Sequence, residues 1–288
     1  MKQRVNTIAP GVFALLLCVP AGAAHRDYKV EDREAFHHTF ASDHALDVDA
    51  VNGSITVVGD GGNTIRVDGE KVIHAADEEE VQRAKREVVL DVNEKNGIAQ
   101  LYVNGPFRDN DHTSENHGFH DHRNREYEVT YNFTIHVPRA TELALRTVNG
   151  DVKTQDTAGK FTVKDVNGGI AMTDIAGSGV ADTLNGNTVI TFRENPKADC
   201  YFKSFNGKVD VGFQPGLSAN ASVKTFNGGS YTDFEATALA SASEPGQMKN
   251  GKFVFKSNKF SNLRIGSGGP ELKFETFNGN IQIRKLSK

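Results

Sequence analysis

Apolar and polar residues alternate through most of this chain, and one short phrase recurs seven times within that alternation. Each copy has an apolar residue, then Asn-Gly, then mostly apolar or β-branched residues two positions apart. The Asn residues of the copies are Asn52, Asn149, Asn167, Asn185, Asn206, Asn227 and Asn278. Because Asn-Gly readily adopts positive φ, each copy predicts a strand, a sharp bend and a second strand.

Aligning the copies on their Asn predicts the core. The residue four positions earlier is apolar in every copy: Val48, Leu145, Val163, Ala181, Phe202, Val223 and Phe274. Between Asn149 and Asn227 the copies are 18, 18, 21 and 21 residues apart. Units of this length that bury apolar faces against their neighbours are typical of solenoids. The repeats therefore predict a mostly β, repeat-built β-solenoid, with a row of antiparallel hairpins as the alternative.

Stacked copies would also align their side chains. We expect Phe205, Phe226 and Phe277 to stack as one ladder, beside a second ladder made by the Asn side chains. The phenylalanines are interpreted as core residues, because apolar rings of this size are usually buried.

One short helix and one hairpin are predicted near the N-terminus, outside the repeats. Asp77 can cap a helix in which Glu80 is its capping-box partner and which ends near Glu87. The segments 88–92 and 98–103 flank Asn-Gly and predict a hairpin. Residues 127–137 alternate strictly and predict a long strand that ends at a proline. Residues 104–125 and 236–246 are expected to be exposed loops.

The first 24 residues have the pattern of a secretory signal. Lys2 and Arg4 precede an apolar run over 8–19, and Ala21-Gly22-Ala23 is a typical cleavage site. The run is too short to span a membrane, and no transmembrane segment follows it. We therefore expect an exported protein, periplasmic or secreted. Its domains would be a signal peptide (1–24), a polar lead-in (25–44) and one β-solenoid domain (45–288) with insertions at 70–138 and 235–250.

The net charge limits the possible partners, and the position of the remaining cysteine predicts its reactivity. The net charge is −4, and it becomes −6 without Lys2 and Arg4, because residues 1–24 contain no acid. This balance argues against nucleic acid as a partner. Cys200 is the one cysteine outside the signal pattern, and its place in an apolar column predicts an inert core thiol.

No catalytic signature is present in the sequence. Asp156 and Asp174 both stand seven positions after an Asn, so two carboxylates could lie on neighbouring repeats, as in solenoid enzymes that cleave polysaccharides. The next two repeats place Phe192 and Phe213 there, so a solvated surface pair is the preferred interpretation.

Histidines between residues 112 and 122 are the best candidates for binding chemistry. His112, His117, His120 and His122 could bind a divalent transition metal such as zinc, copper or nickel. The alternative is a hydrophilic loop with solvated imidazoles. No other cofactor is expected.

The order of these elements resembles the bacterial "putative adhesin" β-strand-repeat family, a group of exported domains of unknown function. The resemblance rests on the signal pattern, the first repeat 51–57, the strand ending Ile135-His136-Val137-Pro138 and the last repeat 276–281. It covers about residues 45–285. It implies a right-handed parallel β-helix-like solenoid with an adhesion role, and no catalytic residues.

Together these features predict an exported, non-catalytic, adhesin-like binding or structural module of the cell envelope. Its partner would be an envelope or surface protein or a polysaccharide. The alternatives are a carbohydrate-active solenoid enzyme and a periplasmic metal-binding protein that uses the histidines of 112–122.

Overall fold

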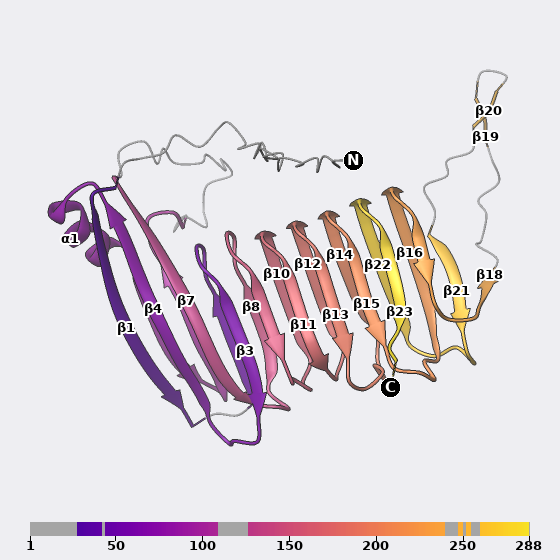
Figure 1. The fold of residues 1–288 in the computed structure, drawn as a ribbon, viewed down its shortest axis with the longest axis horizontal. Helices are drawn as coiled ribbons and strands as arrows, with labels where there is room; N and C mark the ends of the chain where they lie inside the picture. The colour runs from indigo at the N-terminus through magenta and orange to yellow at the C-terminus, as the bar shows by residue number, and fades with distance from the viewer. Residues whose placement is uncertain are drawn as a thin grey trace, which may run out of the picture.

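The computed structural model describes residues 28–41, 44–108, 126–239, 247–249, 252–254 and 260–287. Most of this part lies in two large sheets whose strands line up side by side along the longest axis (Figure 1). The ten-strand sheet has the order β1 (Val30–Phe40), β4 (Ile65–Ala75), β7 (Tyr127–Pro138), β3 (Ile55–Asp60), β9 (Val152–Gln155), β11 (Ile170–Ile175), β13 (Thr188–Phe192), β15 (Val209–Phe213), β23 (Ile281–Lys285) and β17 (Ser230–Thr232).

The eleven-strand sheet carries the first strand of each repeat. Its order is β18 (Ala236–Leu239), β21 (Ser261–Ile265), β16 (Ala219–Asn227), β22 (Glu271–Asn278), β14 (Cys200–Asn206), β12 (Gly179–Asn185), β10 (Phe161–Asn167), β8 (Glu142–Arg146), β2 (Ala45–Asp49), β6 (Ile98–Asn104) and β5 (Val89–Lys95). A separate pair joins β19 (Gln247–Lys249) to β20 (Lys252–Val254).

The Asn-Gly repeats stack in parallel and in register. Val163 on β10 pairs with Leu145 on β8 and with Ala181 on β12, and Ala181 pairs with Phe202 on β14. The column four positions before each Asn is buried in every copy, as the alternation predicts. Antiparallel hairpins are thereby excluded for these repeats, because each strand of a repeat pairs with the matching strand of the next one.

The prediction of a β-solenoid, and of a right-handed parallel β-helix, is nevertheless wrong. The two sheets are open and mixed, with antiparallel strands at their ends: β1, β4 and β7 in one sheet, and β5–β6 and β16–β21–β18 in the other. The last repeat also leaves the order of the chain, because β22 lies between β14 and β16. A solenoid requires every turn of the chain to add to the same end, and this chain doubles back at both ends.

Two segments for which the sequence predicts no strand do contain strands, β1 and β18. Residues 30–40 were expected to be a polar lead-in, but β1 pairs with β4 along its whole length. Most of its side chains are at least partly exposed, so no buried stripe marks it in the sequence; Phe36 and Phe40 are its apolar anchors. The expected loop over 236–246 begins with β18, whereas residues 240–246 lie outside the described part.

The helix and hairpin near the N-terminus are confirmed. Helix α1 (Glu78–Glu87) is capped by Asp77, whose carboxylate accepts a 2.9 Å hydrogen bond from the Glu80 amide. The helix buries Val81 and Ala84, and it contacts β4 and β7. Strands β5 and β6 form the hairpin.

The interior between the sheets is apolar, with interlocking aromatic rings. Phe192 and Phe213 stack with centroids 5.1 Å apart, and Phe202 lies 5.3 Å from Phe274. Cys200 is buried as predicted, and burial raises the pKa of its thiol to about 11. The thiol is therefore inert at physiological pH.

Crowding between stacked turns requires the glycine after each Asn, and at Gly53, Gly150 and Gly228 the predicted positive φ (115°, 143° and 159°) requires it as well. Gly207 does not have the expected positive φ. A Cβ added there would lie 2.0 Å from the carbonyl oxygen of Gly186 in the next turn, which is far inside van der Waals contact. Stacked turns are thus so close that a side chain cannot be accommodated.

Candidate functional site

A ladder of amides runs along the edge where the repeats turn from one sheet to the other. The Asn side chains lie in the spatial order Asn227, Asn278, Asn206, Asn185, Asn167, Asn149 and Asn52. The Nδ2 of each of the first six donates to Oδ1 of the next, over 2.7 to 3.0 Å. The predicted Asn ladder is thereby confirmed. Each amide inside the ladder uses one of its two N–H groups and one lone pair, so each exposed rung keeps one donor and one acceptor for another molecule.

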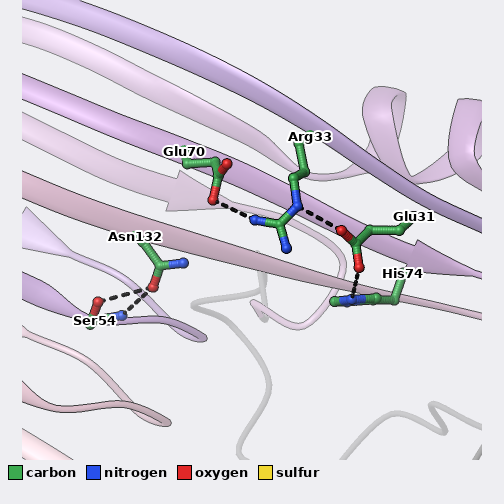
Figure 2. A network of polar contacts seen from close by, with 6 residues as sticks. All are labelled: Glu31, Arg33, Ser54, Glu70, His74 and Asn132. Atoms are coloured by element: carbon green, nitrogen blue, oxygen red, sulfur yellow. Dashed lines mark hydrogen bonds and ion pairs between the residues drawn. The ribbon is translucent and has the colours of Figure 1, made fainter.

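One end of the ladder is closed by β7. Asn52 donates from Nδ2 to the carbonyl of Val129 over 3.3 Å. Asn132, also on β7, accepts from the backbone amide and the hydroxyl of Ser54 at 3.1 and 3.0 Å (Figure 2). Asn227 forms the opposite end, where its Nδ2 donates to Asn278.

A row of apolar side chains, the apolar stripe, lies directly beside the ladder. Its residues immediately precede the Asn residues, and the most exposed are Val148, Leu184, Phe205, Phe277 and Phe226, with 37, 44, 39, 39 and 64% of their surface exposed. The interpretation of the three phenylalanines as core residues is therefore wrong. In a strand, positions two and four before the Asn face inward, so the position immediately before it faces out.

The three phenylalanines of the stripe stack as predicted, in an order that the sequence does not show. Phe277 is the middle ring: its centroid lies 4.8 Å from that of Phe205 and 4.7 Å from that of Phe226, with ring planes within 4° of parallel. Most ring faces are covered by one another, and Phe226 at the end of the stack is the most exposed.

Charged side chains form a separate network on β1 and β4. Arg33 donates from Nε to Glu31 at 2.6 Å and from Nη1 to Glu70 at 2.9 Å, and His74 lies 3.1 Å from the second oxygen of Glu31 (Figure 2). The hydrogen bond and charge of Arg33 lower the pKa of Glu31. These side chains are well exposed and pair with one another, as is usual for a solvated sheet surface.

The carboxylate pair at Asp156 and Asp174 has a structural role in this arrangement. Both residues have positive φ, 57° and 52°: Asp156 at the bend after β9, and Asp174 at the register shift near the end of β11. Arg193 donates from Nη1 to Asp156 Oδ1 at 3.1 Å and to the carbonyl oxygen of Asp174 at 3.2 Å, so it links the two positions. Phe192 and Phe213 are buried, so the acidic column ends after two repeats.

The predicted metal ligands His112, His117, His120 and His122 lie outside the described residues, as does the signal pattern of 1–24. Metal binding there stays a prediction. Within the described ranges, no three His, Cys, Asp or Glu side chains gather as a metal site would require. The same part of the chain holds no helix with the length and apolarity needed to cross a membrane.

Comparison with known proteins gives no assignment from sequence: no family model matches the chain, and no curated protein does. Among solved structures it is similar to a "putative cell adhesion protein" from Clostridium sporogenes, at 13% identity and a TM-score of 0.43, over 89% of this chain and 100% of the other. It is similar to a "putative adhesin" from Bacteroides fragilis at 10% identity and a TM-score of 0.36, over 88 and 97%.

A third similar structure is a "putative lipid binding protein" from Parabacteroides distasonis, at 9% identity and a TM-score of 0.28, over 89 and 97% of the two chains. All three TM-scores are below 0.5, so these similarities carry no functional conclusion. Membership of the adhesin family therefore stays a prediction from the sequence.

Proposed function

We propose that this chain is an exported, adhesin-like, non-catalytic module of the cell envelope, and that it binds an extended polysaccharide along the apolar stripe and the Asn ladder. The observation that carries the proposal is the pairing of the two rows. The exposed Asn amides from Asn149 to Asn227 each present both a donor and an acceptor, and an apolar side chain lies beside each amide. Export is supported by the signal pattern of 1–24.

A polysaccharide matches this surface because its residues also repeat and also present both kinds of group. Sugar rings have apolar C–H faces for contact with Phe226 and Leu184, and hydroxyls that can donate to and accept from amides. Parallel strands repeat at about 4.8 Å, so the surface is periodic along the array. The rigid stacking of the turns holds the groups in place before binding, which reduces the entropy cost of binding.

The proposal is tested by affinity electrophoresis and co-sedimentation with peptidoglycan and with extracellular polysaccharide from the cells that make the protein. We expect at least one of these polymers to retard the native chain. The double variant Leu184→Ser, Phe226→Ser should weaken the retardation at least tenfold, because it removes the two most exposed apolar side chains of the stripe and leaves the core intact.

Ile98→Ser is the matched control, because Ile98 is equally exposed (43%) but lies on β6, away from the stripe. It should bind like the native chain. Equal retardation of the native chain and the double variant would contradict the proposed surface. Binding to an envelope protein and to none of the polymers would contradict the polysaccharide and favour a protein partner.

A further inference from the structure

A column of side-chain hydroxyl groups links neighbouring turns through hydrogen bonds to the backbone. The residue two positions before the Asn is buried or nearly buried, and its Oγ donates to the carbonyl oxygen of the glycine in the neighbouring turn. Five such bonds are formed: Thr147 to Gly53 (3.3 Å), Thr183 to Gly168 (2.9 Å), Ser204 to Gly186 (2.6 Å), Thr276 to Gly207 (2.9 Å) and Thr225 to Gly279 (2.9 Å).

Asp165 breaks this column on β10. It occupies the same position, two before Asn167, and it is paired across the sheet with Thr183. By the pattern of the other five turns, its acceptor would be the carbonyl oxygen of Gly150. A Cβ added at Gly168 would lie 2.3 Å from that oxygen and 2.5 Å from Asp165 Oδ2, so both atoms face the same point.

The carboxyl group of Asp165 is buried without a hydrogen-bond partner in the described part of the chain. The residue is 5% exposed, and neither of its carboxyl oxygens has a hydrogen-bond partner within the described part of the chain. Thr154 is the other residue there with a buried, unpartnered side-chain oxygen. An ionised carboxylate can only accept hydrogen bonds, and here it would face a carbonyl oxygen that is also an acceptor. A protonated carboxyl has an O–H to donate.

We infer that Asp165 is held as a neutral carboxylic acid in the native array and donates its O–H to the Gly150 carbonyl, as threonine or serine does in the other turns. Ionisation of this one group turns the donor into an acceptor and leaves a buried charge. The side-chain hydrogen bond from Asp165 to the neighbouring turn therefore depends on pH, whereas the other five such bonds come from hydroxyls that do not titrate.

The surroundings agree with a neutral group. Burial, the largest cause, and the nearby carboxylate of Asp151 together raise the pKa of Asp165 to about 7. The backbone amides of Val166 and Asn167 offset part of the rise, although their geometry falls short of hydrogen bonding.

Within the described part of the chain, the charged side chains of the flanking strands β8 and β12 are ion-paired with residues other than Asp165. On the flanking strands, Arg146 is paired with Asp47, and Asp182 with Lys203. In the opposite sheet, β9 and β11 bury Val152 and Ile170.

The sign of the pH effect follows from linkage. In the unfolded chain the carboxyl titrates near 3.8, and in the folded chain near 7, so the folded state holds the proton more tightly between these values. The stabilising contribution is complete below about pH 4 and is lost as the pH rises toward 7 and above.

The test compares the pH dependence of urea unfolding, from pH 4 to 8.5, for the native chain, Asp165→Thr and Asp165→Asn. Both substitutions supply a donor that does not titrate in this range. We expect the unfolding equilibrium constant of the native chain, relative to Asp165→Thr, to rise at least tenfold between pH 4.5 and 7.5. Asp165→Asn should follow Asp165→Thr. Asp182→Asn, a carboxylate change on β12, should keep the native pH dependence.

A carboxyl-carbon NMR titration adds a direct measurement. A midpoint for Asp165 near 7, lowered in Asp151→Asn, is the expected result. A midpoint near 4, or parallel stability profiles for the native chain and Asp165→Thr, would overturn the inference. So would stabilisation of the native chain by Ca²⁺ at pH 8 that is absent in Asp165→Thr, since Asp165 would then be an ionised ligand.

Discussion

The ring of Phe205 stacks on that of Phe277 with a 4.8 Å separation and planes 2° apart, although a whole further repeat, with Phe226, lies between them in the chain. The contact exists because β22 enters the sheet between β14 and β16. The last repeat of the chain is thus an internal layer of the array.

This order of rings predicts an uneven pattern of energetic coupling. Double-mutant cycles to alanine should give coupling energies of about 0.5–1.5 kcal/mol for Phe205 with Phe277 and for Phe226 with Phe277, because these rings touch. The cycle for Phe205 with Phe226 should stay within about 0.3 kcal/mol of zero. A coupling of Phe205 with Phe226 larger than that of Phe205 with Phe277 would mean that the strands follow chain order.

Burial predicts that phenylalanines in different columns contribute unequally to stability. Phe202→Ala should cost about 3–5 kcal/mol, because Phe202 is fully buried and packs on Phe274. Phe226→Ala should cost less than about 1.5 kcal/mol, since Phe226 is largely exposed and touches one ring of the stack. Urea melts of the two variants measure the difference. Equal losses of stability would contradict the burial of Phe202 and the exposure of Phe226.

Crowding between turns predicts the effect of replacing a glycine. Gly207→Val should destabilise by about 1–3 kcal/mol, because its Cβ would meet the Gly186 carbonyl at 2.0 Å. Gly61→Val, in the turn after β3, has open space around its Cβ and should change stability by about 0.5 kcal/mol or less. Thermal melts compare the two. A loss at Gly61 that matches the loss at Gly207 would show that the stacked turns can relax.

The amide ladder predicts that removal of one Asn side chain lowers the free energy of unfolding through the loss of two hydrogen bonds. Asn185 donates to Asn167 at 2.9 Å and accepts from Asn206 at 2.8 Å, so Asn185→Ala removes two hydrogen bonds. We expect a loss of about 1–3 kcal/mol in urea unfolding. Asn63→Ala, in an exposed turn outside the ladder, is the control and should stay within about 0.5 kcal/mol. Equal changes in stability for the two substitutions would mean that the ladder hydrogen bonds do not stabilise the fold.

Much of the candidate site follows from the repeats. The Asn ladder and the stacking of Phe205, Phe226 and Phe277 could be predicted because identical positions of in-register strands must meet. Their exposure was misjudged, although strand alternation itself places the residue before each Asn outside. The role of Asp165 was missed as well. Its signal in the sequence is a lone acid in a column that otherwise holds Ala50, threonine or serine.

The sequence by itself determined the local features: the strand–bend–strand units, the inward column through Val163 and Phe202, the cap of α1 at Asp77 and the hairpin at Asn96-Gly97. Each depends on residues close together in the chain, whose spacing fixes which side chains share a face. Tertiary structure alone decided the open mixed sheets, the antiparallel pairing of β1 and the insertion of β22. Strand edges offer nearly the same backbone hydrogen bonds to any partner, so the packing of the whole molecule selects which strands pair.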